Sequence, residues 1–135
     1  MSIQPEAKLK RKLREGFEAV TGGPKGPNAF CTALVASLGQ KPGLPDQFFA
    51  VGGRSVWIES KVEPNDLSDI QRHTIGRMVR AGAKVRVLTF HASKTVFVRT
   101  PLPDGTIPDA VAVFNTKDMK TNLFWDYVLG VHRVS

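Results

Sequence analysis

The sequence has few of the residues that thiol or zinc chemistry needs. It contains one cysteine, Cys31, in 135 residues, which excludes an intramolecular disulfide framework and argues against a cysteine-based zinc site. Cys31 lies in the apolar run 29–38, so we interpret it as a core thiol and not as a nucleophile. The three histidines, at 73, 91 and 132, lack the i, i+4 spacing of a zinc-binding helix.

Long apolar runs are also missing. No segment approaches the roughly 18 apolar residues of a membrane-spanning helix. The basic N-terminal stretch is not followed by an apolar segment, so we expect no signal peptide and a cytoplasmic protein.

The glycine-rich segment 22–26 follows a predicted helix and lacks the Gly-Lys-Ser/Thr of a phosphate-binding loop.

Acidic residues are outnumbered. Nineteen Lys and Arg against twelve Asp and Glu give a net charge of +7. A small basic domain often binds a polyanion, although a merely soluble positive surface is the alternative. Basic side chains placed to contact DNA phosphates are Lys8, Arg11, Lys12, Lys25 and Arg72.

Hydrophobic periodicity predicts a single α/β (α+β) domain over 1–135, with a central mixed sheet flanked by helices. Helices are expected at 5–20 and 67–80, the second capped by Asp66 with Asp69. Strands are expected at 29–38, 46–51, 55–62, 84–90 and 95–99, with a turn at Gly52-Gly53. Segment 100–135 remains unassigned, beyond a further strand and a short helix around 123–129.

Two strands carry the candidate chemistry. Side chains alternate between the two faces of a strand, so Glu59, Lys61 and Trp57 share one face. We expect Trp57 to pack beside the other two. Asp46 opens the preceding strand, and a hairpin register brings its carboxylate next to Glu59. Converging carboxylates repel unless a cation lies between them, and hard oxygen ligands suit Mg²⁺ or Mn²⁺. A surface ion pair for Glu59 and Lys61, and a turn role for Asp46, are the alternatives.

Each helix places one polar residue in its apolar stripe. Gln71 lies in the middle of the second helix's stripe, where an amide needs partners, either as a satisfied buried group or at the edge of a polar site. Glu6 lies within the stripe of the first helix, whereas Glu15 and Glu18 point away from it. A solvated carboxylate at a helix N-terminus is the alternative for Glu6.

Taken together, these motifs resemble the PD-(D/E)xK nuclease superfamily. The motifs are Gly43-Leu44-Pro45-Asp46, Ile58-Glu59-Ser60-Lys61 and Leu67-Ser68-Asp69-Ile70-Gln71. Within the superfamily, the chain resembles the virus-type replication-repair nuclease (VRR-NUC) group over residues 5–99, most closely over 43–90. Ser60 departs from the aliphatic residue common there, at a position expected to face away from the site.

The resemblance implies a restriction-endonuclease-like core, Mg²⁺ or Mn²⁺, and phosphodiester hydrolysis that leaves a 5′-phosphate. By matched position, Asp46, Glu59 and Glu6 would bind the metal, Lys61 would act on the water or the phosphate, and Gln71 would support the site.

Stand-alone members resemble Holliday-junction resolvases, so branched DNA is the expected substrate. Paired cuts call for two active sites and hence a homodimer. A bacteriophage role in replication or recombination fits the small size. The alternatives are a non-catalytic DNA-binding module, a sequence-specific restriction-type nuclease, and a structural protein with a coincidental Glu-x-Lys.

Overall fold

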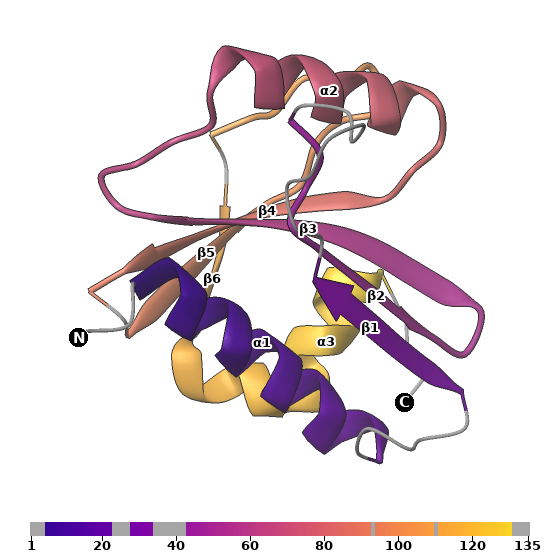
Figure 1. The fold of residues 1–135 in the computed structure, drawn as a ribbon, viewed down its shortest axis with the longest axis vertical. Helices are drawn as coiled ribbons and strands as arrows, with labels where there is room; N and C mark the ends of the chain where they lie inside the picture. The colour runs from indigo at the N-terminus through magenta and orange to yellow at the C-terminus, as the bar shows by residue number, and fades with distance from the viewer. Residues whose placement is uncertain (1–4, 23–27, 34–42, 93, 110, 131–135) are drawn as a thin grey trace.

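The computed structural model describes residues 5–22, 28–33, 43–92, 94–109 and 111–130. Figure 1 shows a twisted sheet with helices on both faces. The helices are α1 (Pro5–Thr21), α2 (Asp69–Arg80) and α3 (Asn122–Leu129), with a 3₁₀ turn, η1 (Thr116–Lys120), before α3. The strands are β1 (Ala29–Ala33), β2 (Gln47–Val51), β3 (Arg54–Val62), β4 (Val85–His91), β5 (Thr95–Arg99) and β6 (Val111–Asn115).

The six strands form one mixed sheet in the order β1-β2-β3-β4-β5-β6. Only β3 and β4 pair in parallel among these strands; the other neighbours are antiparallel. Helix α2 makes the crossover that a parallel pair requires. The predicted α/β class, with a central mixed sheet flanked by helices, is therefore confirmed.

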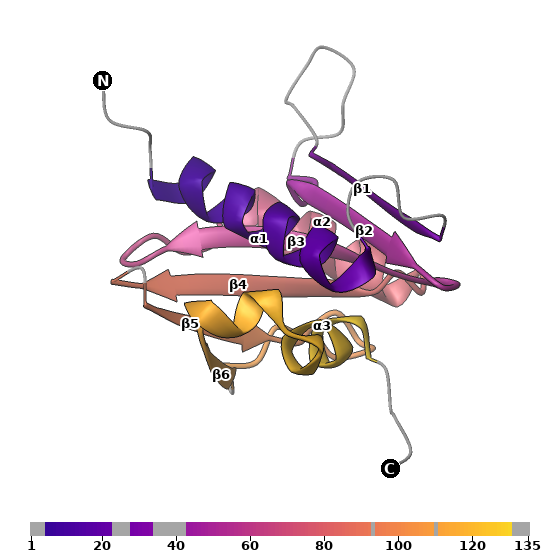
Figure 2. The same ribbon diagram turned by 90° about the horizontal axis from the view of Figure 1, so that it is seen from below.

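Side-chain alternation divides the core between the two faces of the sheet. Val56 and Ile58 of β3 face α1 and α3, and they belong to the larger buried cluster. Trp57 faces the other way and packs against the smaller cluster under α2, as expected. Figure 2 shows α1 and α3 together on the near face of the sheet and α2 behind it. Trp57 therefore lies on the α2 side of β3.

One local prediction was wrong, and another holds only in part. Helix α2 is capped by Ser68, whose Oγ accepts from the Gln71 amide (3.2 Å) while Gln71 Oε1 accepts from the Ser68 amide (2.9 Å). Asp66 instead accepts from Leu67 N and pairs with arginines, because it lies two residues before the N-cap position. Cys31 packs against the larger cluster, as expected of a core thiol, but it is only half-buried because β1 is an edge strand.

The segment after residue 100 extends the same fold. Strand β6 pairs with β5, and α3 buries Phe124, Trp125 and Val128 in the larger cluster. The expected further strand and short helix are both present. Within the predicted strand 29–38, residues 34–38 lie outside the described part of the chain. None of the helices in that described part has the length and apolarity to cross a membrane.

Candidate metal centre

The sheet brings Asp46 and Glu59 together where β2 and β3 stop pairing. Gln47 and Ile58 are the last paired residues at that end of the hairpin, so Asp46 and Glu59 follow directly beyond them. Gly43 determines the direction in which the chain approaches Asp46. It has φ +84°, and a Cβ there would lie 2.7 Å from the carbonyl oxygen of Ile70. Only glycine fits both this backbone angle and this close approach to α2.

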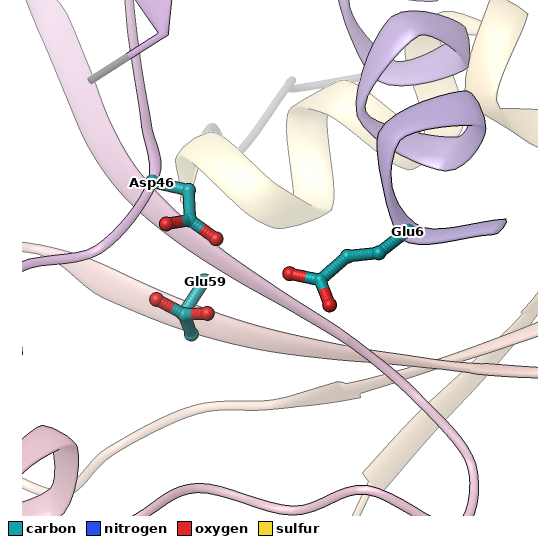
Figure 3. A group of neighbouring side chains, drawn as sticks. All are labelled: Glu6, Asp46 and Glu59. Carbon is teal, nitrogen blue, oxygen red and sulfur yellow. The ribbon is translucent and has the colours of Figure 1, made fainter. Parts of the chain in front are cut away.

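Helix α1 supplies a third carboxylate. Leu9, Leu13 and Phe17 are almost fully buried and hold α1 against the sheet. Glu6, in the first turn, then points toward Asp46 and Glu59 (Figure 3). One carboxylate oxygen from each of the three lies within 4.8 Å of the others. The placement of Glu6 beside the other two matches the sequence expectation.

Glu59 is the buried member of the cluster. Its side chain is only 1% exposed, and its Oε1 has no hydrogen-bond partner among the described residues. Burial, followed by the charge and hydrogen bonding of Asp46, raises the pKa of Glu59 from 4.5 to about 8, against the opposing charges of Lys61 and Lys10. Burial and the neighbouring carboxylate thus both disfavour the charged form of Glu59, and a nearby cation would oppose them.

Two lysines border the cluster. Lys61 Nζ lies 4.0 Å from Glu59 Oε2, and its side chain is 16% exposed. Lys10 Nζ lies 2.8 Å from Asp46 Oδ2 and 3.2 Å from Glu6 Oε1. Burial lowers the pKa of Lys10, but the hydrogen bonds and charges of Asp46 and Glu6 outweigh it, so the pKa rises. Lys10 is therefore a fixed cation within the cluster.

Lys10 was not among the site residues expected from the sequence. Its position four residues after Glu6 was a usable signal, because residues at this spacing are neighbours on a helix surface. Lys10 is also held by its backbone, since its carbonyl accepts a hydrogen bond from Gln47 Nε2 (3.1 Å). Lys10 is thus held both at its backbone and at its ammonium group.

The donor set fits a hard divalent cation. Three carboxylates converge, and the orphaned Oε1 of Glu59 is an acceptor that a cation would satisfy. All-oxygen ligation with room for water suits Mg²⁺ or Mn²⁺. Within the described residues no second group of three His, Cys, Asp or Glu side chains converges in this way.

The other predicted site residues that the structure describes lie on α1 and α2. Gln71 is half-buried at the start of α2, and its Oε1 is used by the helix cap. Lys8 and Arg11 are exposed on α1, and Lys12 is half-buried. Arg72 forms an ion pair with Asp66 (2.8 Å).

Two further residues from the sequence analysis, at 25 and 132, lie outside the described residues. Among the remaining histidines, His91 pairs with Glu63, and His73 is exposed. Ser60 is buried on the face opposite Glu59, as expected.

No protein-family model matches the chain, and none of the curated proteins matches it. Among solved structures, its fold is similar to that of Hjc, a Holliday junction resolvase from the archaeal hyperthermophile Archaeoglobus fulgidus. The TM-score is 0.48, with 18% sequence identity over 68% of this chain and 72% of that chain. At that score and identity, neither a family nor an activity follows from the likeness, so the chemistry must be sought in this chain's own side chains.

Proposed function

We propose that this protein is a divalent-metal-dependent DNA endonuclease that hydrolyses phosphodiester bonds. One observation carries the proposal. Glu6, Asp46 and Glu59 place carboxylate oxygens within 4.8 Å of one another, and one buried oxygen of Glu59 has no partner among the described residues. A cluster built only for stability would satisfy that oxygen, because an unsatisfied buried acceptor costs about 1–3 kcal/mol.

Each residue has a defined role in this mechanism. Asp46, Glu59 and Glu6 would hold Mg²⁺ or Mn²⁺, which would supply an activated water and neutralise phosphate charge. Lys61 orients the attacking water or stabilises negative charge that develops on the phosphate, because its ammonium lies at the edge of the cluster beside Glu59. Trp57 and Phe48, with ring centroids 4.9 Å apart, pack beside the site and stiffen β2 and β3.

The positive charge of the protein supports the proposal of a polyanionic substrate. The chain carries a net charge of +7, and Lys8 and Arg11 are exposed on the helix that supplies Glu6. Together with Lys12, Lys25 and Arg72 they are proposed DNA contacts. Branched DNA, cut by a homodimer, is the proposed substrate on the basis of the motif resemblance.

The direct test is cleavage of labelled four-way junctions, flaps and linear duplexes with Mg²⁺ or Mn²⁺. Wild type is compared with Asp46→Asn and Lys61→Ala, and with the exposed control variants Asp109→Asn and Lys120→Ala. We expect metal-dependent cuts near the branch point that only the first two variants abolish. Binding of every DNA without cleavage by either metal would replace the nuclease with a DNA-binding module.

A further inference from the structure

A basic groove of about 440 Å³ runs between α1 and β1, directly beside the acidic cluster. One wall carries Lys10, Arg11 and Arg14 of α1, and the other carries Cys31 of β1 and Gln47 of β2. Lys10 and Gln47 tie the groove to the cluster, because Lys10 pairs with Asp46 and Gln47 follows Asp46 in the chain. A ligand at the cluster can therefore continue into the groove.

The charge of the groove is opposite to that of the cluster. Its lining in the described part of the chain includes three cationic side chains and no carboxylate. Arg14 has only a weak ion pair, with its Nε 4.0 Å from Glu18 Oε1 and its side chain 54% exposed. Arg11 is also exposed. These guanidinium groups remain accessible to an anion, and their planar donors match phosphate oxygens.

Gln47 adds a requirement that an inorganic anion does not meet. Its side chain is 4% exposed, and its Nε2 donates to the carbonyl of Lys10. Its Oε1 is buried without a partner among the described residues. Because an orphaned acceptor is costly, this oxygen favours a ligand that brings its own N–H or O–H donor.

We propose that this groove binds the stretch of a single DNA strand that adjoins the scissile phosphate. Phosphates of that strand face Arg11 and Arg14, and a base or sugar donor reaches Gln47 Oε1. The volume lies within the roughly 300–1,000 Å³ of small-ligand sites and accommodates about one nucleotide. This assignment rests on the proposed nuclease function and adds the path of the strand to it.

Cys31 provides a site-specific test, because it is the only cysteine in the chain and lines the groove. Its alkylation by a maleimide is timed in Lys61→Ala protein with Mg²⁺, where DNA binds without being cut. Saturating splayed-arm DNA should slow the labelling at least about fivefold, whereas Mg²⁺ alone should not slow it. Cys31→Ser serves as the unlabelled control.

The outcomes separate the groove from the nuclease. If anisotropy shows full DNA binding and wild type still cuts, but the labelling rate of Cys31 is unchanged, the groove assignment is overturned and the nuclease stands. If the DNA does not bind at all, both proposals fail.

A second measurement tests the cationic wall. Arg14→Ala should weaken DNA binding roughly three- to tenfold and lower the salt dependence by about one phosphate contact. The matched control is Arg77→Ala, an exposed arginine on α2 at the opposite face of the sheet, which should change neither quantity. Equal losses in the two variants would mean a diffuse positive surface and would overturn the assignment of a strand path.

Discussion

Two carboxylate sites in this molecule, one a cluster of three and the other a single residue, have opposite electrostatics. In the cluster of Glu6, Asp46 and Glu59, burial and a neighbouring carboxylate raise the pKa of Glu59 to about 8. At the loop between β3 and α2, Asp66 accepts from Arg99 Nη2 and Arg72 Nη2, both at 2.8 Å, and from the Leu67 amide. The hydrogen bond from Arg99, the largest cause, lowers the pKa of Asp66 despite some burial.

The difference lies in how completely the oxygens are satisfied. Both oxygens of Asp66 receive charged donors, so this group has no need of a ligand and serves to fix the loop before α2. Glu59 keeps one buried oxygen without a donor among the described residues, although two lysines are close. Acidic residues near basic ones occur in both places, and the two differ in burial and in the number of donors that each carboxylate oxygen receives.

The largest difference should appear in catalysis. Asp46→Asn removes one of the proposed anionic ligands, and we expect the cleavage rate to fall at least about 100-fold, because even outer partners of metal ligands typically contribute 10–100-fold. Asp66→Asn should leave the rate within about twofold below its melting temperature. Comparable losses in both variants, measured as single-turnover rates, would show that the two groups are not functionally distinct.

The pH dependences should have opposite signs. For Glu59, the folded protein keeps a proton that the unfolded chain has released between pH 4.5 and about 8, so without metal its contribution to stability falls as the pH rises through that window. For Asp66, whose folded pKa lies below 3.8, the contribution is present above that value and is lost as the pH falls below it.

The affinity for a divalent metal should change over the same pH range as the stability contribution of Glu59. Mn²⁺ must displace the proton of Glu59, so its affinity, measured by calorimetry, should increase by up to about tenfold per pH unit below pH 8. An affinity that does not change between pH 6 and 8 would contradict the raised pKa of Glu59. The matched variant, Glu59→Gln, should remove the slope in the stability of the metal-free protein.

The free energy of unfolding should be more sensitive to substitution of Asp66, in the loop before α2, than to substitution within the acidic cluster. Asp66→Asn leaves Arg99, which is 8% exposed, with a weaker acceptor, and we expect the free energy of unfolding to fall by about 1–2 kcal/mol. The effect is moderated because the Asp66 side chain is 54% exposed and partly screened by water. Urea unfolding measures it, with the exposed Asp109→Asn as the control; an unchanged midpoint would exclude a structural role for the pair.

The smallest effect concerns Lys10, the fixed cation of the acidic cluster. Replacing it with Met removes a competitor for Asp46 and Glu6, and Mn²⁺ should bind up to about fivefold more tightly, as expected for partly exposed ion pairs. The exposed Lys8→Met should leave Mn²⁺ affinity unchanged. Weaker binding in Lys10→Met would show instead that the ammonium organises the carboxylates.

The sequence predicted those parts that depend on periodicity and short-range register. The stripe of α1 placed Glu6 correctly, because the helix docks through the same apolar side chains that define the stripe. The Gly52-Gly53 turn fixed the hairpin, and the hairpin register placed Asp46 beside Glu59.

Prediction from the sequence failed where two residues could fill the same local role, or where contacts between distant segments determine the burial of a side chain. Asp66 and Ser68 are both good helix caps, and Arg99, distant in sequence, holds Asp66 elsewhere. The half-burial of Cys31 depends on β1 lying at the edge of the sheet, which no local pattern reveals. Likewise, Trp125 enters the core through contacts with Phe17 and Phe49, from segments far along the chain.

The cap of α2 also determines what Gln71 can offer. Because the Ser68 amide donates to Oε1, the carboxamide cannot rotate by half a turn without losing that bond. The other end is the NH₂ group, which only donates hydrogen bonds, while Oε1 keeps its second lone pair beside the bond from Ser68. An amide fixed in this orientation presents its NH₂ group to an anion at one defined end. The turn that starts the helix therefore sets the chemical polarity of a side chain that the motif associates with the active site.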